Sequence, residues 1–433
     1  MSDLRRRELL KLAVTAGAVG ALGTARAIRS GDERDGVGQP PREDPEPYDD
    51  YRTLVVDGAG DGDYETISAA VEAARPRDLV LVEPGVYEER VQVLDTPRLT
   101  IRGRDRNAVV LEGGHERRNG VEVVGVDDVV VENLTARNYE YNGVYWTDVD
   151  GYRGSYLTAY NNGEYGLNAY SSVNGRFEHS YASGHPDSGF YVGECDPCHA
   201  VVADVLAERN AIGYSGTNAG GALTIEDSEW RHNMAGIVPN TLDAEELAPQ
   251  SGALIRNNDV HHNANPSAPA KPVAFPAFGT GINVAGGANN RVVGNRVHDH
   301  AYFGVLVTPN VDENLWRPAN NVVRENDVAR SGRADLALGF PAGGGNCFAG
   351  NDFDTSRPPA IERRHGCDSS SLLGAIPGDP WPTLVGGKGA VNAEYGDYPA
   401  GSYEDQPEPE PRRVMPTPQR PPREAVGDPR GGS

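Results

Sequence analysis

A glycine recurs along the middle of the chain at a nearly constant interval. It stands at positions 120, 143, 166, 189, 213, 236, 281 and 304, so the steps are 23, 23, 23, 24, 23, 45 and 23 residues. The step of 45 is about two periods. A fixed period of this length is typical of chains in which one small structural unit stacks on the next. The spacing therefore predicts a repeat architecture.

Each repeat contains short strands. The residue after the glycine is apolar or aromatic, as in Val144 and Leu167, the next residue varies, and the third is mostly apolar or small. This alternation has the period of two that a half-buried strand shows. A second apolar run precedes the glycine, and no helical pattern separates the two. We therefore predict an all-β parallel solenoid of roughly eleven coils over residues 51–368.

An asparagine recurs between the two strands, at Asn138, Asn161, Asn210, Asn233 and Asn263. Equivalent side chains in stacked coils lie about 4.8 Å apart. We therefore expect their amides to hydrogen-bond along the stack as a ladder.

Two stretches resemble a known superfamily. The coil pattern over 120–353 resembles the right-handed parallel β-helix of the pectin-lyase-like superfamily, particularly its secreted β-helix-repeat proteins. The segment 63–71, followed by 82–89, is similar to the N-terminus of pectin methylesterases and of copper-site-maturation β-helix proteins. The resemblance implies a right-handed parallel β-helix. It implies no single activity, because the superfamily includes lyases, hydrolases, esterases, epimerases and non-enzymes.

The two ends of the chain differ from the repeats. Residues 1–27 contain Arg5-Arg6-Arg7, an apolar run and Ala25-Arg26-Ala27, which predict a twin-arginine signal and an extracellular or cell-surface location. The apolar run is too short to span a membrane. Residues 28–50 are predicted to form an acidic linker. Residues 369–433 are predicted to form a Pro/Gly-rich tail, which is draped on the solenoid through Trp381 and Tyr395 and is disordered from about residue 401.

A short amphipathic helix is predicted over 64–74, with Asp63 as its N-cap. Such a helix would cover the open end of the solenoid core. Three stretches break the period, at 241–250, 264–279 and 308–319, and are predicted to be loops. Inserted loops of solenoids often build a binding face, although they can also be neutral.

The charge points to an unusual solvent. The chain carries −23, and residues 1–27 hold five basic and two acidic residues, which leaves −26 after removal of the signal. Lysine occurs only at positions 11, 271 and 388. Such a surface suits high salt, so we expect a halophilic source. It also argues against nucleic acid as a partner. We expect a monomer.

The four cysteines are predicted to form two disulfides, Cys195–Cys198 and Cys347–Cys367, because export favours oxidation. The second would tie the last coil to the segment that leaves it. For the Cys-x-x-Cys pair, half of a metal site and a redox pair are alternatives.

Eleven tyrosines fall between residues 139 and 218. The outward positions two residues after the glycine are predicted to stack one coil apart, and acidic or amide positions follow at the next corner. Aromatic rings stack on sugar faces, and polar groups bond to sugar hydroxyls. We therefore predict substrate-binding roles for Tyr145, Asp148, Asn168, Ser215 and Asn218. The alternative is a tyrosine-rich surface without a ligand.

Catalytic roles are predicted for His185, Asp187, Tyr191 and Glu194, which follow one another around a single glycine. A His or Tyr base beside a carboxylate could abstract the C5 proton of a uronate, and two carboxylates could hydrolyse a glycosidic bond. His185-Pro186-Asp187 is partly similar to the Asp-Pro-His motif of mannuronan epimerases. The alternative is a solvated turn.

Histidines recur at equivalent turns of neighbouring coils, and His232, His262 and Asp299 are predicted to line up about 4.8 Å apart. Such a row could bind a divalent metal, and solvated turn histidines are the alternative. No other cofactor is predicted. Together these features predict an exported protein that acts on or binds an extracellular, acidic polysaccharide, as a lyase, epimerase or glycoside hydrolase. The alternative is a non-catalytic surface, adhesion or structural module.

Overall fold

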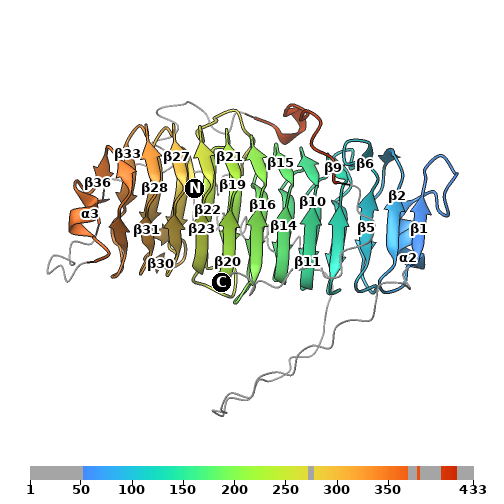
Figure 1. The fold of residues 1–433 in the computed structure, drawn as a ribbon, viewed down its shortest axis with the longest axis horizontal. Coiled ribbons are helices and arrows are strands. Elements are labelled where there is room, and N and C mark those ends of the chain that lie inside the picture. The colour runs from blue at the N-terminus through green and yellow to red at the C-terminus, as the bar shows by residue number, and fades with distance from the viewer. Residues whose placement is uncertain (1–51, 272–276, 369–377, 381–400, 417–433) are drawn as a thin grey trace, which may run out of the picture. The chain divides into compact units, whose positions relative to one another are not determined.

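The computed structural model describes residues 52–271, 277–368, 378–380 and 401–416. They form a parallel β-helix, as the glycine period predicted (Figure 1). Three parallel sheets run along the stack, and each coil passes through them in the same order. The predicted signal, the acidic linker, Trp381 and Tyr395 lie outside the described residues.

Sheet 1 has twelve strands: β1 (Thr53–Val56), β2 (Leu79–Val82), β5 (Thr100–Gly103), β8 (Val129–Glu132), β11 (Asp150–Ser155), β14 (Val173–Glu178), β17 (Ala200–Ala203), β20 (Gly220–Glu226), β23 (Ser251–Arg256), β26 (Arg291–Val293), β31 (Val322–Arg324) and β34 (Cys347–Ala349). Sheet 2 has eleven: β3 (Gly85–Tyr87), β6 (Val109–Glu112), β9 (Thr135–Arg137), β12 (Thr158–Tyr160), β15 (Tyr181–Ser183), β18 (Leu206–Glu208), β21 (Glu229–Arg231), β24 (Asp259–His261), β27 (Arg296–His298), β32 (Asp327–Ala329) and β35 (Asp352–Phe353).

Sheet 3 contains the recurring glycines and also has eleven strands: β4 (Val91–Val93), β7 (Asn119–Val124), β10 (Asn142–Thr147), β13 (Tyr165–Tyr170), β16 (Ser188–Gly193), β19 (Ile212–Thr217), β22 (Ala235–Asn240), β25 (Thr280–Ala285), β28 (Phe303–Thr308), β33 (Ala334–Leu338) and β36 (Ser356–Arg357). We call the turns from sheet 1 to 2, from 2 to 3, and from 3 to 1 the first, second and third corners.

The glycine is required by the distance between successive coils. A Cβ added to Gly166 would lie 2.5 Å from the carbonyl oxygen of Gly189, and one added to Gly213 would lie 2.8 Å from that of Gly236. The same approach recurs from Gly120 to Gly281, so each glycine lies against the glycine of the next coil. A side chain at this position would push the two coils apart.

The predicted amide ladder is present at the second corner, shifted by one residue in the earlier coils. Asn210 donates from its backbone and side chain to Asn233 Oδ1, both at 3.0 Å, and Asn233 does the same to Asn263 Oδ1. Asn138 and Asn161 are not members, because they occupy the preceding left-handed position of the corner. Similar amide ladders at the other two corners link successive coils, as between Asn295 and Asn326 at the first and Asn290 and Asn321 at the third.

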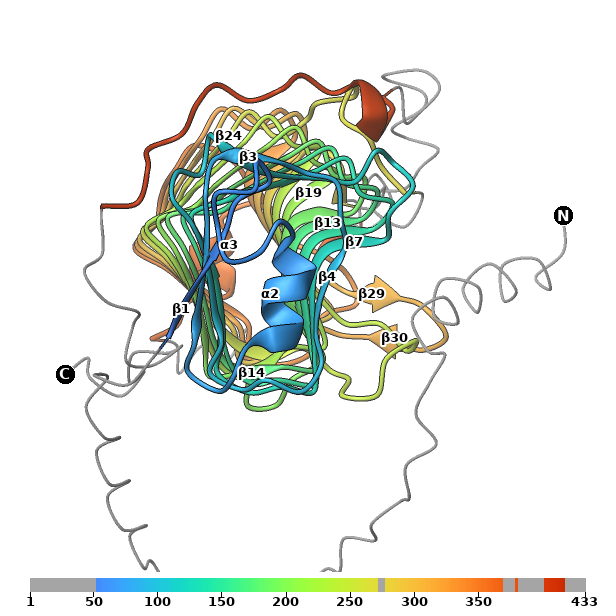
Figure 2. The same cartoon turned by 90° about the vertical axis from the view of Figure 1, so that its right-hand side faces the viewer.

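Both ends of the core are covered. Helix α2 (Ile67–Ala73) buries Ile67, Ala70 and Val71 across the N-terminal end, as Figure 2 shows. Its N-cap is Thr66 rather than Asp63, because Asp63 Oδ2 accepts a hydrogen bond from the backbone of β1 instead. At the other end lies α3 (Ile361–Arg364), with Ile361 buried.

Both predicted disulfides are confirmed. Cys347–Cys367 joins the last coil to the segment that follows α3, and Cys195–Cys198 closes a turn at the third corner. The described residues contain no helix that is long and apolar enough to cross a membrane.

The tail departs from its prediction, because residues 401–416 lie on the solenoid. This segment, which contains the short 3-10 helix η3 (Tyr403–Asp405), runs along the stack (Figure 1). Asn161 Nδ2 donates to Gln406 O at 2.8 Å, and the Arg412 guanidinium stacks 3.6 Å from the Tyr181 ring centroid. Contacts with the side chains of Asn161 and Tyr181 thus hold a segment whose own composition predicts disorder.

Candidate functional site

The outward positions of sheet 3 stack in the predicted register. Tyr145 pairs with Asn168, Asn168 with Tyr191, and Tyr191 with Ser215. Tyr145 is half-buried, whereas the other three are buried, with Tyr191 only 3% exposed. The column therefore exists, but most of it is covered.

The cover is the inserted loop 241–250. The Tyr191 hydroxyl donates to Glu245 Oε1 at 3.1 Å, and Glu194 Oε1 accepts from the backbone N–H groups of Glu246 and Leu247 at 2.7 and 2.8 Å. Asn218, which was predicted to bind substrate, instead exchanges two hydrogen bonds with the backbone of Leu242. These contacts bring a new acidic residue onto the tyrosine column.

A hairpin supports the same loop from the outside. Strands β29 (Asn310–Val311) and β30 (Leu315–Trp316) pair antiparallel within the insertion at 308–319 and project from the stack (Figure 2). Asp243 accepts hydrogen bonds from Asn314 and from the indole of Trp316. The two insertions thus form one unit that holds Glu245 in place.

Glu245 and Glu194 form a carboxyl pair. Burial raises the pKa of Glu245 to about 8, and the charge of Glu194 and a hydrogen bond to it act in the same direction. Glu194 Oε2 is buried and accepts no hydrogen bond from an N–H or hydroxyl group of the described residues. Two ionised carboxylates in contact would repel each other. Glu245 therefore carries a proton at neutral pH.

A second carboxyl group lies on the other side of two tyrosine rings. The rings of Tyr165 and Tyr191 are 5.0 Å apart, and Tyr165 hydrogen-bonds to Asp187. Burial raises the pKa of Asp187 to about 6, against the opposing charge of Lys271. Since this value still lies below 7, Asp187 is mostly ionised at neutral pH.

Lys271 comes from the insertion at 264–279. Its ammonium group forms an ion pair with Glu164, and its backbone N–H donates to Pro186 O at 2.6 Å. Farther along, Phe278 and Ala268 of the same insertion join a second apolar cluster on the outer face of sheet 3, with Val238 and Leu306. Two insertions thus border the same face. We call Tyr165, Asp187, Tyr191, Glu194 and Glu245 the tyrosine–acid surface.

His185 does not belong to this surface. Its side chain is fully buried at the second corner, where Nδ1 lies 2.7 Å from Asn210 Oδ1 and Nε2 lies 3.1 Å from Asn162 Nδ2. Burial lowers its pKa to about 4, although the bond to Asn210 opposes the shift. His185 replaces an asparagine in the ladder, so it cannot touch a substrate as the base that the sequence predicted.

The sequence analysis missed Glu245 and Tyr165. Tyr165 stands one residue before its glycine, where the period of two predicts an inward position like that of Leu167. Its ring instead lies beside Tyr191 and Asp187, so the period could not have identified it. Glu245 lies in a loop without a repeat, so only the fold brings it to Glu194. Asp148 is exposed at the third corner, two coils from Glu194, and Ser215 accepts from Asn240 Nδ2 at 3.3 Å.

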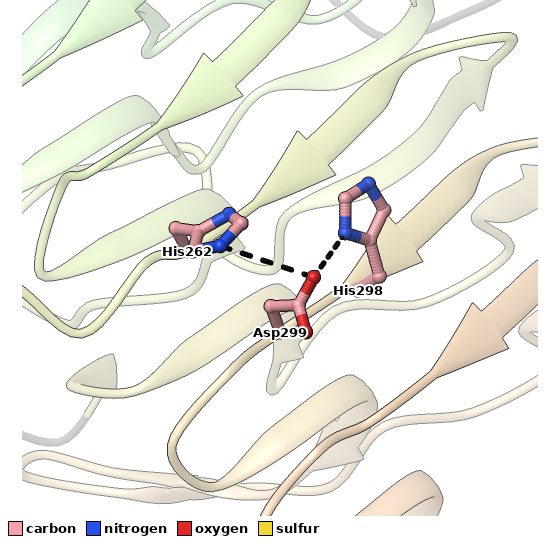
Figure 3. A group of neighbouring side chains, drawn as sticks. All are labelled: His262, His298 and Asp299. Atoms are coloured by element: carbon pink, nitrogen blue, oxygen red, sulfur yellow. Dashed lines mark hydrogen bonds and ion pairs between the residues drawn. The ribbon is translucent and has the colours of Figure 1, made fainter.

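The predicted metal row is partly assembled. Figure 3 shows His262, His298 and Asp299, whose ligand atoms all lie within 4.8 Å of one another. His232 is not in this group, although its ring centroid lies 5.4 Å from that of His262. His298 takes its place because it ends β27 and points outward beside Asp299.

No protein-family model matches the chain, and a search of curated protein sequences finds no match. Solved structures do match. The A-module of the mannuronan C-5 epimerase AlgE4 from Azotobacter vinelandii aligns with a TM-score of 0.50 and 16% identity, over 66% of this chain and 90% of that module. The chain therefore shares the parallel β-helix fold of that module. An alginate lyase from Paenibacillus sp. str. FPU-7 aligns with a TM-score of 0.43 and 15% identity, over 70% of this chain and 95% of that one.

Proposed function

We propose that this protein acts on an extracellular polysaccharide at the tyrosine–acid surface. The observation that carries the proposal is the pairing of a protonated carboxyl group, Glu245, with an ionised one, Asp187, across two tyrosine rings. Two carboxyl groups with pKa values on either side of neutrality are what acid–base cleavage of a glycosidic bond requires. Tyrosine rings also suit the faces of sugar rings.

Each residue has a distinct role in this proposal. Glu245 gives a proton to the leaving oxygen, and Asp187 takes one from water or from the sugar. Tyr165 lies between them and orients Asp187 through its hydrogen bond. Glu194 keeps Glu245 protonated. The epimerase whose A-module has a similar fold is named for mannuronan, which is also a polysaccharide.

The charge of the site bears on the substrate. Glu164 and Asp187 share one lysine, Lys271, and Glu194 adds a further acidic group, so a polyanionic chain is repelled at low ionic strength. High salt screens this repulsion within a few ångströms. We therefore keep an acidic polysaccharide as the proposed substrate in high salt. Export is supported by the two disulfides.

The test measures reducing ends and unsaturated products from acidic and neutral polysaccharides in high salt. Glu245→Gln and Asp187→Asn are each expected to lower kcat at least 100-fold, the usual contribution of a general acid or base. The matched control is Glu325→Gln, because Glu325 is exposed and pairs only with Arg324 next to it. New reducing ends indicate hydrolysis, and unsaturated products indicate elimination.

A non-catalytic binding module is the rival function, in which a sugar chain would contact the half-buried rings of Tyr145 and Tyr165 and no acid–base step would follow. Binding of a polysaccharide without turnover, weakened by Tyr165→Ala but not by Glu245→Gln, would establish the rival. Absence of binding to every polysaccharide tested would rule out both functions.

A further inference from the structure

We infer that His262, His298 and Asp299 form a binding site for a divalent transition-metal ion at the second corner of the C-terminal coils. This inference goes beyond the proposed function and does not depend on it. The three residues come from neighbouring coils, and none of them belongs to the tyrosine–acid surface.

The stacking register brings the three side chains together. His261 pairs with His298 between β24 and β27, so the residues that follow them, His262 and Asp299, occupy equivalent positions. Both have left-handed backbone conformations, with φ of 53° and 61°. The corner therefore directs His262 and Asp299 outward, one coil apart, beside the end of β27 (Figure 3).

The distances suit a metal ion. Asp299 Oδ2 lies 2.7 Å from His298 Nδ1 and 3.9 Å from His262 Nε2. Bonds of about 2.0 Å in a tetrahedral site place two ligand atoms roughly 3.3 Å apart. These two distances bracket that value, and all three ligand atoms lie within 4.8 Å of one another, so shifts of up to about 1.5 Å would complete the geometry.

A cation already occupies part of this position. Arg330 Nη2 lies 2.7 Å from Asp299 Oδ2 and 3.2 Å from His298 Nδ1, and Arg330 Nε lies 2.7 Å from Asp299 Oδ1. Two of the three ligand atoms thus converge on one positive group. The Arg330 side chain is 60% exposed, so it can move into solvent when a metal ion binds.

Neighbouring groups can orient the two imidazoles. His298 Nε2 lies 3.2 Å from Asp259 Oδ1, although neither atom has a hydrogen-bond partner among the described residues. A small rotation of the Asp259 carboxylate would let it accept from Nε2 and leave the Nδ1 lone pair directed at the site. The His262 ring is held on its other side by His261, whose Nδ1 is 2.9 Å from His262 Nδ1 and whose Nε2 is 3.2 Å from Glu229 Oε1. Carboxylates behind ligating histidines fix tautomer and ring orientation in metal sites.

The site faces an open groove of about 680 Å³, lined by His232, His262 and Asp299 among others. Three protein ligands and an accessible fourth position are characteristic of zinc sites that bind water or a further ligand. Two imidazoles and one carboxylate favour Zn²⁺, Cu²⁺ or Ni²⁺ over Ca²⁺ and Mg²⁺, which prefer oxygen ligands.

The test is calorimetric titration of the untagged, chelator-treated full chain with Zn²⁺ and, separately, with Ca²⁺. One Zn²⁺ per chain is expected. His262→Ala and His298→Ala should each weaken binding at least tenfold. The matched control is His179→Ala, because His179 is also a half-exposed histidine paired with an aspartate, Asp204, but lies several coils away. Electron paramagnetic resonance of bound Cu²⁺ should show coupling to two nitrogens.

Arg330→Gln provides a test that keeps all three ligands and does not depend on the folding of the histidine variants. It is expected to tighten Zn²⁺ binding about tenfold, because the competing guanidinium is removed. The inference is overturned if no Zn²⁺ binds, if Ca²⁺ binds equally well, or if correctly folded His262→Ala and His298→Ala variants bind Zn²⁺ as the natural chain does.

Discussion

Single buried polar side chains keep successive coils in register. At the second corner, Asn233 Oδ1 accepts a hydrogen bond from Asn210 in the coil before it. Asn233 Nδ2 donates to Ala207 O and to Asn263 Oδ1, so the whole amide group is hydrogen-bonded. His185 and His300 take the same position in other coils, and burial lowers the pKa of each to about 4. A residue that looks catalytic in the sequence can therefore be a neutral structural link.

Asn233→Ala tests the ladder. It removes the acceptor of the Asn210 backbone N–H and the side-chain donor to the carbonyl of Ala207, while Asn210 Nδ2 keeps its bond to Ala182 O. Each such group costs about 1–3 kcal/mol, so we expect unfolding free energy to fall by about 3 kcal/mol. Urea denaturation measures the change. Asn138→Gly should cost less than about 1 kcal/mol, because glycine accepts the positive φ of this position and the half-buried Asn138 side chain bonds to Glu112. Equal losses in the two variants would contradict the ladder.

The carboxyl pair of Glu245 and Glu194 also predicts that the stability of the fold depends on pH. Because the pKa of Glu245 is raised to about 8, the folded chain holds a proton that the unfolded chain releases above its ordinary pKa near 4.5. Stability should therefore fall as the pH rises from about 5 to 8, by up to about 1.4 kcal/mol per pH unit. Glu245→Gln should flatten this slope in melts recorded between pH 5 and 9. A slope unchanged by the substitution would mean that Glu245 is ionised throughout.

At the scale of the element, the strands of sheet 3 are held closer together than a side chain on the glycine would allow. This close approach, and not a special backbone angle, explains the repeat, because the recurring glycines do not have positive φ. The inserted loops act at the same scale, since 241–250 and the hairpin of β29 and β30 together position Glu245.

Gly213→Ala tests the close approach. The new Cβ would lie 2.8 Å from Gly236 O and 2.9 Å from the Trp230 ring, so the coils must shift. Overpacking of this kind costs about 1–3 kcal/mol, which thermal melting detects. In the control Gly344→Ala the new Cβ meets nothing within 4 Å, and little change is expected. A control as damaging as Gly213→Ala would show that spacing is not the reason for the glycine.

At the scale of the whole molecule, the net charge predicts that stability depends on salt. Residues 28–433 carry −26 and are poor in lysine. Repulsion between such charges weakens as salt shortens the screening length from about 10 Å at 0.1 M to about 3 Å at 1 M. We expect the melting temperature to rise steadily as KCl is raised from 0.1 to 3 M, at equal protein concentration. A melting temperature independent of salt would refute the halophilic interpretation.

The sequence predicted most of the fold because a solenoid is built from local repeats. The glycine period, the alternating strands and the cysteine pairs each depend on residues within one or two coils, and the structure agrees with all three. The exact ladder members were less predictable, since a shift of one residue at a corner exchanges Asn161 for Asn162. The register of Tyr145, Asn168, Tyr191 and Ser215 was also predictable from the period.

The recurring glycine by itself determined which residues stack, because the spacing of the coils leaves room for nothing larger. It could not determine what covers the stack. Only the tertiary structure brought Glu245 to Glu194, Lys271 to Glu164 and Arg330 to Asp299. Glu245 and Lys271 lie in inserted loops without periodicity, so no repeat length encodes their position. Arg330 is in register with Asp299 one coil away, but the insertion at 308–319 interrupts the sequence period between them.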